Sequence, residues 1–183
     1  MLIIVLFNGD YMHFYIKNCK ICIDYLFILV LSLAALFNAN DILLVLLFSS
    51  LHEIGHFAAL IIFKNYPYEL KLSFYGFAVK YESNISRVKE TVVLLSGPLV
   101  NLIFYLILKD NVNLILFLLN VLPIYPLDFA RVLRLYFPKT GAYISRITLI
   151  LICILCVYML VYYKSYSLLF VATYLVLYGI NCD

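Results

Sequence analysis

Long apolar runs separated by short polar segments dominate the chain. The runs cover residues 21–37, 42–63, 91–108, 112–122, 147–163 and 167–180. Runs of mostly Leu, Ile, Val and Phe at these lengths are typical of helices in a lipid bilayer. The pattern therefore predicts an all-α polytopic membrane protein with about six transmembrane helices.

One segment departs from this pattern, directly after the second predicted helix. Residues 70–81 hold aromatic and β-branched side chains in loose alternation around Gly76. This pattern predicts a small β hairpin at the membrane surface. The hairpin is either a structural flap or a strand pair to which an extended peptide adds, and the sequence leaves both readings open.

Composition supports the membrane class. Hydrophobic residues make up 66% of the chain and charged residues only 13%, which is more apolar surface than a soluble globule of 183 residues hides. No linker or internal repeat divides the sequence. We therefore expect residues 1–183 to form a single membrane-embedded domain, in which the last two runs, within 147–180, are additional C-terminal helices.

The basic residues predict the orientation in the membrane. An N-terminus in the cytoplasm leaves only Lys109 and Lys164 on the outer side. The basic residues on the inner side are then Lys17, Lys20, Lys64, Lys71, Lys80, Arg87, Lys89, Arg131, Arg134, Lys139 and Arg146. The positive-inside rule favours this multi-pass topology in the cell membrane. Because the charges lie in loops between helices, they indicate no nucleic-acid partner.

The second predicted helix carries a metal-protease signature, His-Glu-x-x-His. His52 and His56 are one helical turn apart, so both imidazoles leave the same face and can bind one ion. Glu53 lies beside them, where a carboxylate can take a proton from water. These three are the only ionisable residues between positions 42 and 63. The alternative is a pair of buried histidines that hydrogen-bond to neighbouring helices.

A catalytic zinc site usually has three protein ligands, so a third is needed. The carboxylates near the predicted helices are Asp24, Asp41, Asp110 and Asp128. Asp128 follows a segment broken by prolines, and broken backbone at membrane depth is tolerated where it lines a watery cavity. The alternative for Asp128 is a helix-end residue solvated at the cytoplasmic surface.

Three motifs in order carry a resemblance. They are His52-Glu-Ile-Gly-His, Ser96-Gly-Pro with Asn101, and Asn120-x-x-Pro-x-x-Pro-Leu-Asp. Together they resemble the site-2 protease family of intramembrane zinc metalloproteases, peptidase family M50. The third motif is especially similar to the subgroup of stage IV sporulation protein FB. The resemblance is specific over residues 21–134.

The resemblance implies a zinc ion on His52, His56 and Asp128, with Glu53 as the catalytic acid and base. The family pattern has glycine after the aspartate ligand, whereas this chain has Phe129. A side chain there can shift the ligand or narrow the cavity.

The resemblance also implies a substrate-binding region. Asn120 and Pro123 belong to the segment that would hold the substrate strand. Gly97 and Asn101 are assigned to the same region, where they would shape the helix packing and the site.

The expected function is hydrolysis of a peptide bond in a membrane-associated protein near the cytoplasmic side. The resemblance implies a bacterial source, a sporulation sigma-factor precursor as substrate, and membrane-protein regulators. Two alternatives are an inactive pseudoprotease, distorted by Phe129, that acts as a membrane binding partner, and a small transporter whose polar groups line a path. A transporter predicts inverted repeats, which the sequence lacks.

Overall fold

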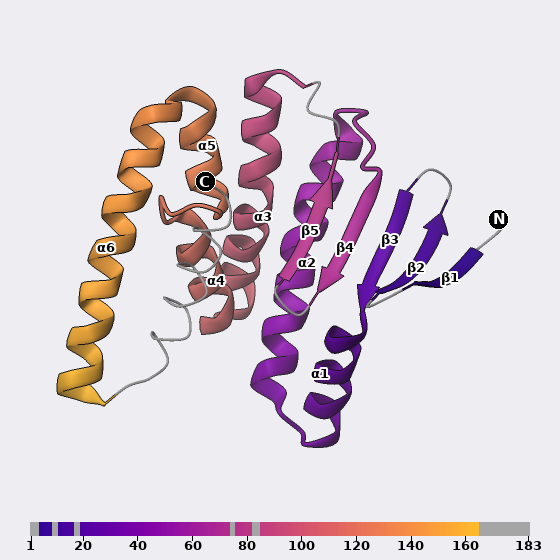
Figure 1. Cartoon of the computed structure of the whole chain (residues 1–183), viewed down its shortest axis with the longest axis horizontal. Coiled ribbons are helices and arrows are strands. Elements are labelled where there is room, and N and C mark those ends of the chain that lie inside the picture. The colour runs from indigo at the N-terminus through magenta and orange to yellow at the C-terminus, as the bar shows by residue number, and fades with distance from the viewer. Residues whose placement is uncertain (1–3, 9–10, 17–18, 74–75, 82–84, 165–183) are drawn as a thin grey trace. The chain divides into compact units, whose positions relative to one another are not determined.

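The structure is a computed structural model, and it describes residues 4–8, 11–16, 19–73, 76–81 and 85–164 (Figure 1). The chain forms two compact units, Met1–Phe117 and Leu118–Asp183. The first contains a five-stranded sheet and helices α1 to α3, and α4 begins there. The second contains the end of α4 together with α5 and α6.

The N-terminal part of the first unit is a sheet, which the apolar pattern did not predict. Strands β1 (Ile4–Asn8), β2 (Tyr11–Ile16) and β3 (Cys19–Asp24) pair in antiparallel order. The expected helix at residues 21–37 is therefore wrong in its first part, and α1 spans only Tyr25–Leu36. Asp24 ends the strand and caps the helix, since its Oδ1 accepts a hydrogen bond from the Leu26 N–H at 2.9 Å.

The predicted hairpin is confirmed, as part of that larger sheet. Strands β4 (Glu69–Ser73) and β5 (Gly76–Lys80) are antiparallel, and β4 pairs in parallel with β3. The sheet order β1-β2-β3-β4-β5 leaves β5 at one edge. Val79 of β5 packs against Ala59 and Leu60 of α2, so this edge lies beside the helix that carries the histidines (Figure 1).

An ion pair joins the two hairpin strands. Lys80 Nζ lies 2.9 Å from Glu69 Oε2, and this hydrogen bond lowers the pKa of the Glu69 carboxyl below its usual value. A lowered carboxyl pKa stabilises the fold above the unfolded-state pKa, and that stability is lost as the pH falls through the folded-state pKa. Because Lys80 is 53% exposed, the contribution is at most about 1 kcal/mol.

Glu69→Gln is therefore expected to lower the thermal unfolding midpoint slightly at pH 7. The difference from the wild type should shrink as the pH falls below the usual glutamate pKa of about 4.3. It should vanish only below the lowered folded-state pKa, where the carboxyl is protonated in both states. Midpoints measured in detergent at pH 7 and pH 3 test this. A difference of the same size at both pH values would show that packing, and not charge, accounts for the effect.

Within the described ranges, fewer helices than expected are long enough to cross a bilayer. Among the described residues, three are long and apolar enough by length and composition, namely α2 (Asn40–Ile62), α3 (Arg87–Leu108) and α6 (Pro138–Tyr163). Helix α1 has 12 residues and α4 (Asn111–Val121) has 11. At about 1.5 Å per residue, both fall short of a hydrocarbon core about 30 Å thick. The sixth expected run, residues 167–180, lies outside the described residues.

Helices α2 and α3 pack closely through small residues. A Cβ added to Gly55 would lie 2.8 Å from the Ser96 carbonyl oxygen and 3.2 Å from the Gly97 Cα. Such contacts require glycine, and helix pairs in membranes commonly approach through small residues. The close approach places side chains of α2 directly against the backbone of α3.

In the second unit, the residues after Asp128 are helical. The expected loop carrying Arg131 and Arg134 is wrong, since α5 spans Asp128–Tyr136 and α6 begins at Pro138. Ala130 and Val132 are buried while Arg131 is exposed. Helix α5 packs against α6. The two helices are joined without a polar linker.

The proline-rich segment before α5 is not helical, as predicted. Pro123 and Pro126 lie in residues 122–127, between α4 and α5. Tyr125 donates its backbone N–H to Ser145 Oγ of α6 at 2.7 Å. The guanidinium of Arg134 lies 4.0 Å from the centre of the Tyr125 ring, which is cation–π geometry. These contacts hold the segment against α5 and α6.

Several helices end in left-handed residues that are not glycine. Lys64 follows α2, Lys109 follows α3 and Lys164 follows α6, with φ of 57°, 57° and 50°. The same conformation occurs at Asn38 after α1. An L side chain is disfavoured in this region, so each lysine holds a conformation that glycine would adopt at lower cost.

Candidate metal centre

The histidines of the metal-protease signature lie buried on α2. The exposed fraction is 6% for His52 and 7% for His56, and Glu53 is half-buried. One ligand atom from each of these residues lies within 4.8 Å of the others. Within the described part of the chain, this is the one such group of His, Cys, Asp and Glu that could hold a metal ion. The predicted grouping of the three side chains is therefore present in the structure.

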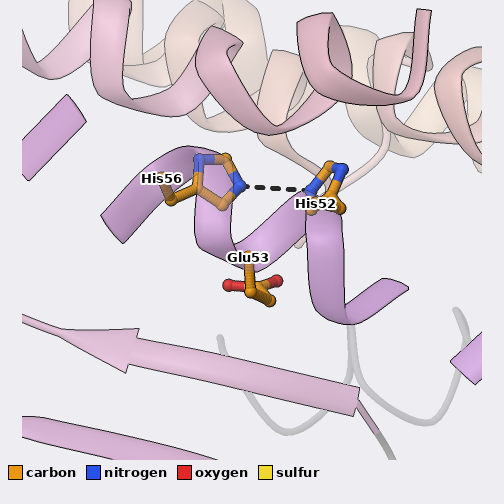
Figure 2. Close-up of side chains that lie close together, drawn as sticks. All are labelled: His52, Glu53 and His56. Carbon is orange, nitrogen blue, oxygen red and sulfur yellow. Dashed lines mark hydrogen bonds between the residues drawn. The ribbon is translucent and has the colours of Figure 1, made fainter. Parts of the chain in front are cut away.

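The two imidazoles face each other through the same type of nitrogen. His52 Nε2 and His56 Nε2 are 3.1 Å apart, and the ring planes are almost perpendicular at 84° (Figure 2). In a tetrahedral site with Zn–N distances of about 2.0–2.1 Å, two ligand nitrogens are roughly 3.3 Å apart. The observed separation is close to that spacing without rearrangement of α2.

A backbone carbonyl of α3 orients His56. His56 Nδ1 lies 2.7 Å from the Val93 carbonyl oxygen, which also accepts a hydrogen bond from Ser96 Oγ at 2.6 Å. A carbonyl oxygen can only accept, so Nδ1 carries the proton and the lone pair is at Nε2. Metal-binding histidines commonly donate their second N–H to such an acceptor.

A buried amide of α3 contacts His52. Asn101 is fully buried, and its Nδ2 lies 3.0 Å from His52 Nδ1. The sequence assigned Asn101 to the substrate-binding region, and this contact to a candidate metal ligand was not foreseen. It depends on how α2 and α3 pack, and the spacing of residues in either helix alone gives no signal for it.

Gly97 lets the backbone of α3 lie directly against the two histidines. A Cβ on Gly97 would collide with the Nε2 atoms of both His56 and His52. Only glycine permits this close approach, because its Cα bears no side-chain atom.

These observations test whether a zinc ion fits. Two imidazoles are part of the donor set that zinc binds in catalytic sites. The nitrogen spacing and the lone pair on His56 Nε2 suit such an ion. The residues present therefore fit a zinc ion between the histidines.

Glu53 lies on a different side of α2 from the imidazoles. Figure 2 shows its carboxylate on the side where a strand runs, whereas the histidines lie toward the neighbouring helix. Edge strand β5 contacts α2. The Glu53 carboxylate therefore lies close to the histidine pair and also faces the sheet.

The remaining site residues of the sequence analysis lie in the second unit. Asp128 is the first residue of α5, is buried, and has Oδ1 3.9 Å from Arg131 Nη1. Asn120 is in the last turn of α4, and Pro123 lies in the non-helical segment, both half-buried. Phe129 is also half-buried. The assignments of these residues to zinc and substrate stay predictions.

A comparison with solved structures finds a protein with a similar fold. The structure is similar to that of the site-2 protease from Methanocaldococcus jannaschii, with a TM-score of 0.65 and 20% sequence identity. The match covers 98% of this chain and 94% of that chain. No family model matches the sequence, and no curated protein matches it either. The chain thus has the fold of a site-2 protease.

Proposed function

We propose that the protein is an intramembrane zinc metalloendopeptidase. The main observation behind the proposal is a pair of buried histidines on a helix that is long and apolar enough to span a membrane. Their Nε2 atoms face each other 3.1 Å apart, next to Gly97. Ionisable side chains inside such helices are costly and usually functional. The fold shared with a site-2 protease supports the same reaction class.

The zinc ligands would be His52, His56 and Asp128. The first two are on the same face of α2, and the third rests on the resemblance of its motif and on its burial at the start of α5. When bound, zinc lowers the pKa of a coordinated water and polarises a carbonyl group.

Glu53 would move the proton. Its carboxylate is the acidic group beside the imidazole pair, so it accepts a proton from the attacking water. It then returns that proton to the nitrogen of the leaving amine, which restores the carboxylate. Glu53 is half-buried, and partial exclusion of water strengthens its hydrogen bonds to the reacting groups.

The substrate would be a membrane-associated protein bound in extended form. A continuous helix keeps its amides in internal hydrogen bonds, so a segment must unwind before cleavage. Edge strand β5 lies beside α2, and a peptide added there would approach the Glu53 side of the helix. Asn120 and Pro123 would hold the substrate strand, and Gly97 and Asn101 would shape the packing of α3 beside the histidines.

The finer assignment rests on the resemblance in the Asn120–Asp128 motif. It favours the subgroup of stage IV sporulation protein FB, with a membrane-associated sigma-factor precursor as the substrate. The source would then be bacterial, and the N-terminus would lie on the cytoplasmic side of the cell membrane. Membrane-protein regulators would restrain the cleavage.

Zinc content of the detergent-purified protein tests the proposal. We expect one zinc per chain in the wild type, none in His52→Ala, and a loss of at least about tenfold in zinc affinity in Asp128→Ala. Cleavage of a membrane-tethered reporter should fall in parallel. Asp41→Ala is the matched control, because Asp41 is an exposed carboxylate in the first turn of α2.

The outcomes separate the alternatives. A folded wild-type protein without zinc would refute the metalloprotease. Stoichiometric zinc without cleavage of any tethered substrate would leave a metal-binding pseudoprotease instead. Unchanged zinc affinity in Asp128→Ala would remove Asp128 from the ligand set.

A further inference from the structure

A chain of hydrogen bonds runs through the candidate metal centre from α3 through α2 and back to α3. Its fixed end is His56, where Nδ1 must donate to the Val93 carbonyl oxygen at 2.7 Å. A neutral imidazole carries one N–H. His56 Nε2 is therefore an acceptor.

The direction of the next contact follows. His52 Nε2 lies 3.1 Å from His56 Nε2, and two lone pairs at that distance would repel. His52 Nε2 must then donate, which leaves His52 Nδ1 as an acceptor. Asn101 Nδ2 lies 3.0 Å from His52 Nδ1 and donates to it. Without a metal ion, all three hydrogen bonds can therefore form at the same time, each with one donor and one acceptor.

A metal ion requires a different arrangement. Both Nε2 atoms must then offer lone pairs to the ion, so the proton of His52 has to be on Nδ1. The Asn101 NH₂ group would then face an N–H, which is repulsive. Turning the carboxamide over brings Oδ1 to the same place, where it accepts from Nδ1–H.

Nothing else among the described residues holds the Asn101 amide in one orientation. Asn101 Oδ1 is buried and has no hydrogen-bond partner there, so turning the amide over breaks no second hydrogen bond. The amide oxygen and nitrogen are almost the same size. The preferred orientation is therefore set by His52.

We infer that Asn101 is a positioning residue for the metal site, whose carboxamide donates to His52 Nδ1 without metal and accepts from Nδ1–H with metal. The inference rests on the proposed zinc site. It explains why a carboxamide suits this position, since asparagine offers a donor and an acceptor in the same volume. Leucine offers neither, and aspartate in its ionised form offers only acceptors.

Nitrogen-15 NMR of histidine-labelled protein tests the inference directly. The chain has only three histidines, so the spectra are simple to assign with His13→Gln. Without zinc, we expect the proton of His52 on Nε2 and that of His56 on Nδ1. With zinc, both should carry it on Nδ1. Identical tautomers of His52 in both states would overturn the inference.

Variants give a second readout, zinc affinity measured by competition with a chelating dye. Asn101→Leu should weaken zinc binding about 10–100-fold, as loss of a supporting hydrogen bond to a ligand does. Asn101→Asp should restore most of the affinity, because it keeps an acceptor for Nδ1–H. Equal losses in the two variants would show a packing role and refute the positioning role.

Asn113 provides a matched control. It is the other fully buried asparagine of the first unit, and neither of its amide atoms has a hydrogen-bond partner among the described residues. Asn113→Leu should therefore leave zinc affinity within about twofold, the expected size of an unrelated change. A loss of zinc affinity as large as in Asn101→Leu would show that burying a leucine, and not losing the contact with His52, causes the effect.

The two proposals fail in different ways. No zinc in the folded wild type would refute the zinc site itself, whatever the tautomers are. Stoichiometric zinc with His52 already protonated on Nδ1 in the metal-free protein would refute only the inference about Asn101.

Discussion

Glu53→Gln is expected to lower peptide hydrolysis at least about 10²–10⁴-fold while leaving the zinc content unchanged. Glutamine has nearly the same size and fits the half-buried position, but it cannot accept a proton from water. The carboxylate lies on another side of α2 from the facing imidazole nitrogens (Figure 2). Its removal should therefore affect proton transfer and not metal binding.

Single-turnover cleavage of a membrane-tethered reporter, with zinc counted per chain, checks this prediction. Glu90→Gln is a suitable control, because Glu90 is a half-buried glutamate in the first turn of α3. It should cleave like the wild type. If Glu53→Gln loses its zinc, Glu53 is a ligand. If it cleaves at the normal rate, another group is the base.

Gly97→Ala is expected to lower zinc affinity by at least about 100-fold, the upper end of what loss of a ligand's supporting contact does. The added methyl group would collide with both imidazoles, 2.7 Å from His52 Nε2 and closer still to His56 Nε2. These distances are far below van der Waals contact, so the imidazoles must turn away. Helix α3 cannot retreat easily, because it is packed against Gly55.

Two other glycine-to-alanine variants separate displacement of the ligands from damage to packing. Gly55→Ala also disturbs the α2–α3 contact, but its methyl group would meet Ser96 and Val100. It should lower stability by about 1–3 kcal/mol through overpacking and keep zinc in the folded fraction. Gly141→Ala, where the nearest atom is at 3.2 Å, should have little effect on zinc. Normal zinc in Gly97→Ala would contradict the expected displacement of the two imidazoles.

The site on α2 was predictable because it depends on local spacing. Two histidines four residues apart share a face in any helix, and α2 starts and ends within two residues of the expected run. The contacts from α3 were not predictable in this way. Val93 reaches His56 through a backbone oxygen, and Asn101 reaches His52 from 49 positions away. Both contacts depend on how closely the two helices approach.

The N-terminal sheet shows a different limit of the sequence. The expected helix begins at residue 21, yet over residues 19–24 the side chains of Lys20, Cys22 and Asp24 alternate with apolar neighbours. Short apolar runs do not distinguish a strand from a helix. The strand is stabilised by β4, where Lys20 pairs with Glu69. A pairing partner so far along the chain leaves no trace in the local pattern.

Helix α5 was missed for a related reason. Its nine residues carry arginines that read as a cytoplasmic loop, and a helix of that length is marginal on its own. The helix packs against α6, and its Ala130 and Val132 are buried, so tertiary contacts stabilise it. The tertiary contact, which the sequence does not display, decides the structure here.

The lysines that follow α2, α3 and α6 affect both the stability of the fold and its orientation in the membrane. Glycine at Lys64, Lys109 or Lys164 would relieve a left-handed L residue, worth about 1 kcal/mol at each position. The same change removes a cation that attracts the negative end of the helix dipole and marks that end as aqueous. With the N-terminus in the cytoplasm, as proposed, replacing Lys64 would remove a basic residue from the inner side and weaken the signal that orients the protein in the bilayer. Replacing Lys109 or Lys164 would remove a basic residue from the outer side and leave that signal intact.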